Sequence, residues 1–406
     1  MTTSPPRRGR ARIGESRRSA SCRHGNSFAL SFSVFAVCGS PVLAAPNVFV
    51  SRPGEIVRLS DLNGDGDYLD SGERLSYCAG LPAASGAIAT TPNALFIART
   101  DQPIVLRAAD LNGDGDALDA NEVTLYAEWT GGPPAPTFSA LAGAADGVLF
   151  VADSANGRLL RLEDANGDGD ALDFGELLVV GDGLTSPVSL AVRPDGCVLV
   201  AQNLSAAPVR ILRDRNGDGD FFDFAENLSY AESMLPGSGL AATGPWSSFL
   251  ARPATGDVMK LLDLTRDDDA LDAGEVVLYA ANMASATHLA ADGEAALYVA
   301  AADAAGTVYR VEDSNADGDA LDIGEVIPVA EGITMPAGIA VAVAPTVPSC
   351  VRGDLNADGS VTPMDAPLLA NTLIDPTGAE MCRADANDDG LLDGRDVAAF
   401  VAILLP

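Results

Sequence analysis

The chain has 406 residues, enough for one large domain and a small one. It holds 25 Lys and Arg residues against 57 Asp and Glu residues, and its formal net charge at pH 7 is −32. This balance excludes nucleic acid and anionic membranes as partners, because both are recognised by clustered Lys and Arg.

The first 45 residues have the pattern of an export signal. Basic residues up to Arg23 precede an apolar run from Phe28 to Cys38, and small residues follow it. This run is too short and too rich in serine to span a membrane. We therefore predict a signal peptide over 1–45, no membrane insertion, and a secreted or cell-surface protein. A disordered arginine-rich tail, a lipoprotein signal and a twin-arginine signal are the alternatives.

Six copies of one acidic segment follow at intervals of about fifty residues. We number them loops 1 to 6, and they span 61–73, 110–122, 164–176, 214–226, 263–275 and 313–325. Loop 1 reads D-L-N-G-D-G-D-Y-L-D-S-G-E, and the other five align with it without a gap. A repeat of this length indicates a solenoid, a propeller or an array.

Short segments of alternating polarity fill the rest of each repeat. The segment before each loop covers 55–60, 104–109, 158–163, 209–213, 258–262 or 307–312. A second segment such as L-F-I-A precedes it, a third such as R-L-S-Y follows the loop, and a fourth, rich in small residues, opens the next repeat. Four short strands per fifty residues are typical of a β-propeller. We predict a mainly β fold with a six-bladed propeller over 46–345.

The two ends of the repeat region complement each other. The first repeat starts near Asn47 with its second strand, and the last repeat is followed by a spare strand over 338–344. We expect the spare strand to join the first blade and close the ring, which removes two exposed sheet edges. The blade pattern resembles NHL-repeat propellers, with the acidic loop in place of the usual turn between the third and fourth strands. This resemblance implies a fold and no function.

The acidic loops have the composition of a calcium site. Ca²⁺ takes six to eight oxygen ligands, and alternating side chains of a tight loop converge on one point. The pattern resembles an EF-hand loop, but its Glu is the thirteenth residue instead of the twelfth, and strands flank it instead of helices. Which of the acids at positions 7, 10 and 13 bind directly is left open, as is a solvated Asp-Gly turn without metal.

The predicted ligands are the oxygen-bearing residues at positions 1, 3, 5, 7, 10 and 13 of each loop. They are Asp61, Asn63, Asp65, Asp67, Asp70, Glu73; Asp110, Asn112, Asp114, Asp116, Asp119, Glu122; Asp164, Asn166, Asp168, Asp170, Asp173, Glu176; Asp214, Asn216, Asp218, Asp220, Asp223, Glu226; Asp263, Asp267, Asp269, Asp272, Glu275; and Asp313, Asn315, Asp317, Asp319, Asp322, Glu325. In loop 5, Thr265 replaces the Asn, and Arg266 and Asp268 replace the two glycines. A positive charge and a strained turn both weaken that site.

Two further acidic loops lie beyond a short linker at 345–349. D-L-N-A-D-G-S-V-T-P-M-D begins at Asp354 and D-A-N-D-D-G-L-L-D-G-R-D at Asp385, and apolar helical runs follow over 366–373 and 397–405. Two twelve-residue loops, each with a following helix, look like a type I dockerin over 350–406. By that resemblance the calcium ligands are Asp354, Asn356, Asp358, Thr362, Asp365, Asp385, Asn387, Asp389, Asp393 and Asp396. The whole chain is then predicted to hold about eight Ca²⁺ ions.

The dockerin resemblance implies a cohesin-type or cell-surface protein as partner. In cellulosomal dockerins the tenth and eleventh loop residues help to choose the cohesin and are often Ser-Thr. Here these pairs are Pro363-Met364 and Gly394-Arg395, so the identity of the cohesin is open. The alternative is a calcium-stapled end cap without a partner.

The cysteines divide between the two domains. Cys350 and Cys382 each stand just before an acidic loop, and in an exported protein we predict a disulfide between them. Cys78 and Cys197 fall in blades that are far apart around the ring. We expect both to be free and buried.

The propeller offers little catalytic chemistry. Enzymes with six-bladed propellers work at the central channel, but the strands predicted to line it read S-A-L-A-G, S-L-A-V or H-L-A-A. His288 is the one candidate base there, and a single histidine on a strand is more often structural. We predict a binding or surface scaffold. The alternative is a carbohydrate-active, polysaccharide-degrading component of the lyase or lactonase type, in which Trp129 or Trp246 would stack on a sugar.

Overall fold

The computed structural model describes residues 46–82, 85–91, 94–293, 296–342, 366–374 and 394–404. Among these, 24 strands form six four-stranded antiparallel sheets. The signal peptide predicted over 1–45, the linker, both C-terminal acidic loops, and Cys350 and Cys382 lie outside the described residues. The domain boundaries at 345 and 350 stay predictions.

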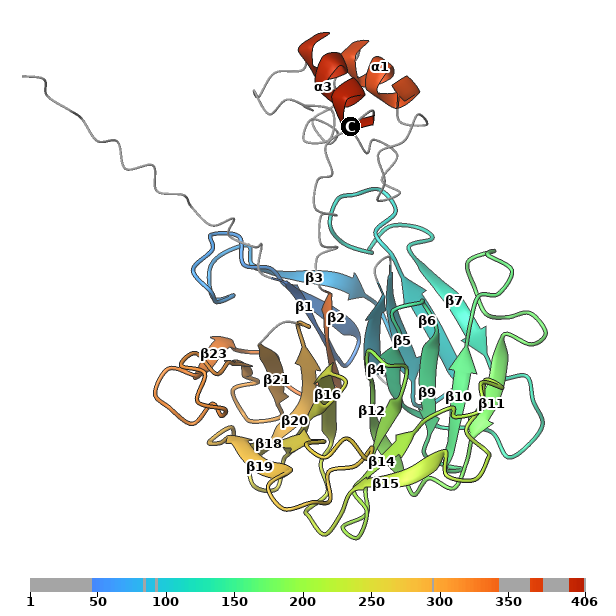
Figure 1. The fold of residues 1–406 in the computed structure, drawn as a ribbon, viewed down its shortest axis with the longest axis vertical. Coiled ribbons are helices and arrows are strands. Elements are labelled where there is room, and N and C mark those ends of the chain that lie inside the picture. The colour runs from blue at the N-terminus through green and yellow to red at the C-terminus, as the bar shows by residue number, and fades with distance from the viewer. Residues whose placement is uncertain are drawn as a thin grey trace, which may run out of the picture. The chain divides into compact units, whose positions relative to one another are not determined.

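We number the sheets as blades 1 to 6 in chain order, each given from its first to its fourth strand (Figure 1). They are β24 (Gly338–Ala342), β1 (Asn47–Arg52), β2 (Glu55–Leu59), β3 (Arg74–Ala79); β4 (Ser85–Thr91), β5 (Ala94–Arg99), β6 (Ile104–Ala108), β7 (Val123–Glu128); β8 (Phe138–Gly143), β9 (Leu149–Asp153), β10 (Arg158–Leu162), β11 (Leu177–Gly181); β12 (Pro187–Val192), β13 (Val198–Gln202), β14 (Val209–Leu212), β15 (Asn227–Ala231); β16 (Gly239–Gly244), β17 (Ser247–Arg252), β18 (Asp257–Leu262), β19 (Val276–Ala280); and β20 (Ala286–Ala291), β21 (Leu297–Ala301), β22 (Val308–Val311), β23 (Val326–Ala330).

The first strands of the blades contact one another in a closed circle, which makes them the innermost strands. The circle closes as predicted, because β24 pairs antiparallel with β1, with Val341 opposite Val48. All six strands predicted before the loops are found within one residue at each end. The six-bladed propeller is therefore confirmed.

The core consists of six clusters of buried side chains, one between each pair of adjacent blades. Second strands such as β9 are buried along their whole length because neighbouring blades cover both faces. A β-bulge between the third and fourth strands recurs in all six blades, for example at Ile56/Val57. A bulge bends a strand and increases its twist, and here it lies toward the end of the hairpin away from the acidic loop that joins the two strands.

Two helices are described in the C-terminal part of the chain, α1 (Ala366–Ile374) and α3 (Gly394–Leu404). They cover the two predicted helical runs to within three residues at each end. Leu369 of α1 and Phe400 of α3 are 3% and 2% exposed and belong to one apolar cluster with Leu373, Ala399 and Leu404. No described helix is long and apolar enough to cross a membrane.

Candidate metal centres

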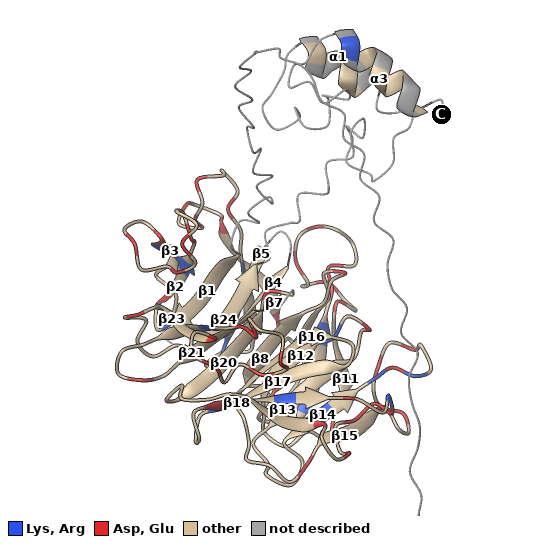
Figure 2. Ribbon diagram, turned by 60° about the vertical axis from the view of Figure 1, so that its left-hand side comes forward, with Lys and Arg blue, Asp and Glu red and all other residues tan. Residues whose placement is uncertain are grey.

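Each acidic loop connects the third and fourth strands of its blade, so all six occupy equivalent places in the ring. Figure 2 shows that the Asp and Glu residues gather on loops, whereas the strands carry few of them. Loop 1, between β2 and β3, shows how the sequence folds such a loop. Gly64 and Gly66 have φ angles of 76° and 91°, in the left-handed region that glycine enters without steric cost.

The first residue of loop 1 fixes the turn. The two carboxylate oxygens of Asp61 accept the backbone N–H groups of Gly64, at 2.6 Å, and of Gly66, at 3.0 Å. The same pair of bonds forms on Asp110, Asp164 and Asp214. The N–H groups of Gly219 and Gly217 hold the pKa of Asp214 below its usual range, so this carboxylate stays charged.

The last residue of loop 1 is a buried acid. Glu73 is 1% exposed, and its oxygens accept the backbone N–H groups of Leu62 at 3.0 Å and Asp70 at 3.1 Å. The Glu at position 13 of the other five loops is also 0–4% exposed. An ionised carboxylate is rarely buried without a counter-charge, and two neutral donors supply only part of what water would provide.

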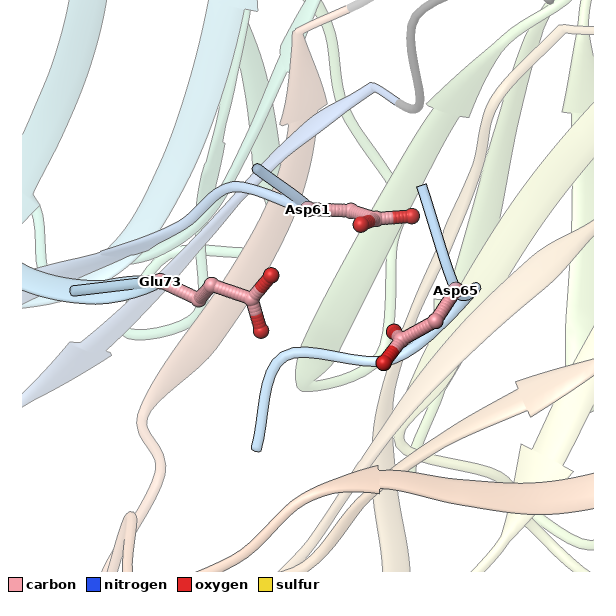
Figure 3. Close-up of side chains that lie close together, drawn as sticks. All are labelled: Asp61, Asp65 and Glu73. Atoms are coloured by element: carbon pink, nitrogen blue, oxygen red, sulfur yellow. The ribbon is translucent and has the colours of Figure 1, made fainter. Parts of the chain in front are cut away.

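The carboxylates of loop 1 converge. One oxygen each of Asp61, Asp65 and Glu73 lies within 4.8 Å of the other two, and Figure 3 shows the three side chains around a common space. In loop 4 the converging group is Asp218, Asp220 and Glu226, which stand at positions 5, 7 and 13 instead of 1, 5 and 13. The donor atoms are all oxygens, which fits a hard cation such as Ca²⁺.

The remaining predicted ligands take different roles within the loop. The amide of Asn63 donates to Asp65 at 3.0 Å and to Asp70 at 2.6 Å, so it holds two carboxylates together. Asp67 accepts the backbone N–H of Leu69 at 2.8 Å and is not part of the loop 1 group. The equivalent Asn residues of loops 2, 3, 4 and 6 make the same two bonds.

Loop 5 differs as its sequence suggests. Asp263 is 2% exposed and accepts the N–H groups of Asp267 and Asp268, both at 3.1 Å. Thr265 has no amide to hold two carboxylates together. Burial, and then the carboxylates of Asp267 and Glu275, raise the pKa of Asp269.

Each loop also contacts the preceding blade, a feature that we did not predict. The backbone N–H at position 8 donates to a carbonyl of that blade's outermost strand, as from Ala117 to Tyr77 at 2.7 Å. The other five bonds are Tyr68 to Val329, Ala171 to Tyr126, Phe221 to Val180, Ala270 to Tyr230 and Ala320 to Tyr279, all 2.7–2.8 Å long. We call these six bonds the seam bonds. The only sequence signal for them is that position 8 is always Ala or aromatic, and all six residues are buried.

Hydroxyl groups that line the central channel take part in hydrogen bonds between blades. A cavity of about 70 Å³ is lined by the innermost strands, including Ser139, Ser189, Ser238 and His288. Ser139 donates to the carbonyl of Pro187 and Ser238 to that of Thr287, both at 2.7 Å. These hydroxyls are therefore used in bonds between neighbouring blades.

His288 is surrounded by these strands, and burial lowers its pKa to about 4. Its Nδ1 lies 3.0 Å from the hydroxyl of Thr287, and the imidazole is neutral at pH 7. No carboxylate is among the described residues that line the cavity. This lining contains no acid–base pair of the kind that a lyase or lactonase would use.

The two tryptophans contact arginines. The guanidinium of Arg158 lies 5.0 Å from the ring centre of Trp129, and those of Arg193 and Arg266 lie 5.6 and 5.4 Å from that of Trp246. Cys78 and Cys197 are free and buried, as predicted.

Comparison with known proteins assigns the two parts of the chain separately. Residues 352–405 match the model of the dockerin type I domain. No curated protein matches the chain significantly in sequence. The chain is thus a mainly β protein that combines a six-bladed propeller with a dockerin type I domain, and domains of this family bind calcium.

Solved structures are similar to the propeller in fold. A chain in the crystal structure of a nidogen/laminin complex is 16% identical, with a TM-score of 0.53 over 74% of this chain and 99% of that one. A virginiamycin B lyase from Staphylococcus aureus is 12% identical, with a TM-score of 0.45 over 73% of this chain and 88% of its own. A streptogramin B lyase is 11% identical, with a TM-score of 0.47 over 73% and 83%. At such identities the likeness extends to the fold alone.

Proposed function

We propose that this chain is a secreted or cell-surface, calcium-loaded binding scaffold whose dockerin domain attaches it to a cohesin-type partner. The observation that carries the proposal is the dockerin type I match at 352–405, joined to a propeller that repeats one oxygen-donor loop six times. Dockerin proteins are typically extracellular, which agrees with the export pattern of residues 1–45.

In this proposal the propeller loops bind Ca²⁺ through the residues at positions 5 and 13 together with position 1 or 7, and positions 3 and 10 complete or support the shell. Converging carboxylates and a buried Glu in an all-oxygen loop support it. With the two dockerin loops, the full chain then holds about eight ions, or seven if loop 5 is empty. Elemental analysis of the purified chain after dialysis against trace calcium measures this number. A value of two or fewer would leave calcium to the dockerin loops alone.

The partner is tested with the full chain against a panel of immobilised type I cohesin modules. We expect binding in millimolar Ca²⁺ and its loss in EDTA, because the dockerin helices are too short to persist without the ions. Asp385→Ala should weaken binding at least tenfold by removing the first ligand of the second dockerin loop. The matched control is Asp61→Ala, which makes the same change in propeller loop 1 and should leave cohesin binding unchanged.

Two outcomes contradict the attachment role. Binding that survives EDTA would show that the surface does not need ordered calcium loops. Failure to bind any cohesin of the panel, with the metal content intact, would favour the end cap. Either result leaves calcium loading of the propeller to be judged by the metal count alone.

A further inference from the structure

The seam between blades 4 and 5 contains a set of ion pairs that involves loop 5. Two arginines of blade 4 contact one carboxylate of loop 5: Arg213 Nη1 lies 3.1 Å from Asp268 Oδ1, and Arg215 Nη2 lies 3.0 Å from Asp268 Oδ2. The Asp268 side chain is 13% exposed, so water screens these contacts only in part. Asp268 stands at position 6, which is glycine in the other five loops.

The second substituted glycine of loop 5 extends this set. Arg266, at position 4, lies over the ring of Trp246, which is also contacted by Arg193. The side chain of Arg193 is fully buried and pairs with Asp195 at 2.9 Å. Asp195 pairs in turn with Arg213 at 2.6 Å. The contacts thus run from loop 5 through both blades and back to loop 5, and we call Arg193, Asp195, Arg213, Arg215, Trp246, Arg266 and Asp268 the arginine clamp.

Two other seams show a different contact at position 6. Arg58 of blade 1 donates to the carbonyl of Gly115 in loop 2, and Lys260 of blade 5 donates to that of Gly318 in loop 6 at 3.0 Å. The two cations occupy equivalent positions on the third strands of their blades, where Arg58 pairs with Phe49 and Lys260 with Phe249. Blade 4 has Ile211 there, so its third strand supplies no cation at this place. Instead, blade 4 supplies two cations that follow the strand: Arg213 directly after β14, and Arg215 at position 2 of loop 4.

The backbone of loop 5 is strained where the clamp requires side chains. Arg266 and Asp268 have φ angles of 63° and 73°, a region that non-glycine residues enter at a cost. Glycine would fit these turns better but would offer neither a guanidinium nor a carboxylate. The clamp contacts are the gain that offsets this strain.

We infer that the arginine clamp closes the seam between blades 4 and 5 without calcium, whereas the other five seams depend on metal in their loops. The inference rests on the proposed calcium loading. Its physical basis is that two arginines place positive charge on loop 5, where the other loops have at most one cation on a backbone carbonyl. The ring then keeps one closed seam when calcium is withdrawn.

Hydrogen–deuterium exchange of the full chain, in millimolar Ca²⁺ and in EDTA, tests this seam by seam. The reporters are the amides that make the seam bonds. In EDTA we expect exchange at Tyr68, Ala117, Ala171, Phe221 and Ala320 to rise about tenfold or more, and exchange at Ala270 to rise less than about twofold. Uniformly raised exchange at all six amides would overturn the clamp and leave calcium loading intact.

Two variants examine the clamp directly. Asp268→Gly gives loop 5 the glycine of the other loops and removes both ion pairs, so exchange at Ala270 in EDTA should rise to match the other seams. Arg215→Gln is milder, because Arg215 is 44% exposed, and it should give an intermediate rise. The matched control is Arg161→Gln, since Arg161 pairs with Glu163 of its own blade at 2.5 Å. The control should leave Ala270 unchanged.

The two proposals fail in different ways. If EDTA changes none of the six amides, calcium loading of the propeller is refuted, and Asp268→Gly then decides the clamp alone. Raised exchange confined to Ala270 in that variant supports the clamp, and unchanged exchange overturns it. If Asp268→Gly does not fold, the same two outcomes are read from Arg215→Gln.

Discussion

The rim of the propeller, by which we mean its six acidic loops, and the central channel are built on opposite principles. At the rim, one set of donor atoms recurs in five loops and in part in loop 5, and the acids outnumber the groups that neutralise them. Around the channel, hydroxyl groups are used in neutral bonds between blades: Ser51 donates to Gly86 and Thr90 to Val341, as Ser139 and Ser238 do at other seams. Neighbouring blades are therefore joined at two radii, by neutral hydrogen bonds inside and by charged loops outside.

This difference predicts that the ion binding of the propeller takes place at the rim. The repeated loops present carboxylates to a common ligand, whereas the described residues that line the cavity are small or aliphatic apart from three serines and the neutral His288. We therefore expect the stability that the rim provides to depend on metal, and the stability that the channel provides to depend on pH. Three experiments test that division, from the largest expected effect to the smallest.

Withdrawal of calcium should have the largest effect. A site at 100 times its Kd stabilises the fold by about 2.7 kcal/mol, so six filled loops contribute on the order of 15 kcal/mol, as much as a whole domain. In EDTA we expect the Tm of the full chain to fall by at least roughly 15 °C relative to millimolar Ca²⁺. Calorimetry measures this shift. An unchanged Tm would remove calcium from the rim, and equal protection by Mg²⁺ would change the identity of the ion.

The sequence predicted the acidic loops and the strands that carry them, but little of the contacts between one blade and the next. Strand order, closure by 338–342 and the buried, free Cys78 and Cys197 followed from the repeat pattern, because the pattern shows which strand the first repeat lacks and in which blade each cysteine falls. The seam bonds and the pairing of Arg213 with Asp268 did not follow, because they depend on how one blade is rotated against the next. The sequence marked loop 5 as degenerate, but only the structure shows what Arg266 and Asp268 contact.

A single rim acid should have an intermediate effect whose sign depends on calcium. Glu73→Gln keeps the shape of this buried side chain but removes its charge. In calcium, loss of one ion should lower the Tm by about 5 °C, since about 2.7 kcal/mol of linkage is lost. In EDTA the same variant should be as stable as the parent or more so, because one of the mutually repelling carboxylates is gone.

The control for Glu73→Gln is Glu312→Gln. Glu312 directly precedes loop 6, pairs with Arg310 at 2.5 Å and is 34% exposed. This variant should bind the same number of ions as the parent, and exposed pairs of this kind contribute about 0–1 kcal/mol. If Glu73→Gln lowers the Tm equally in calcium and in EDTA, its role is packing and not metal binding.

The smallest effect should come from the channel and should depend on pH alone. Burial lowers the pKa of His288 to about 4, below its ordinary value of about 6.5, so the unfolded chain takes up the proton first. The stability that depends on neutral His288 is therefore complete above about pH 6.5 and is lost as the pH falls toward 4. Between pH 7 and 5 this loss amounts to about 2 kcal/mol, or a fall in Tm of roughly 4 °C.

His288→Gln should flatten this part of the pH dependence in calcium and in EDTA alike, because no loop carboxylate is among the described residues that line the cavity. The comparison is the difference in Tm between parent and variant across pH 5–7, measured at both calcium levels, so that the titration of the rim acids cancels. A difference that appears only in EDTA would mean that channel and rim are coupled through the blades. The neutral inner bonds would then not hold the ring independently of the charged loops.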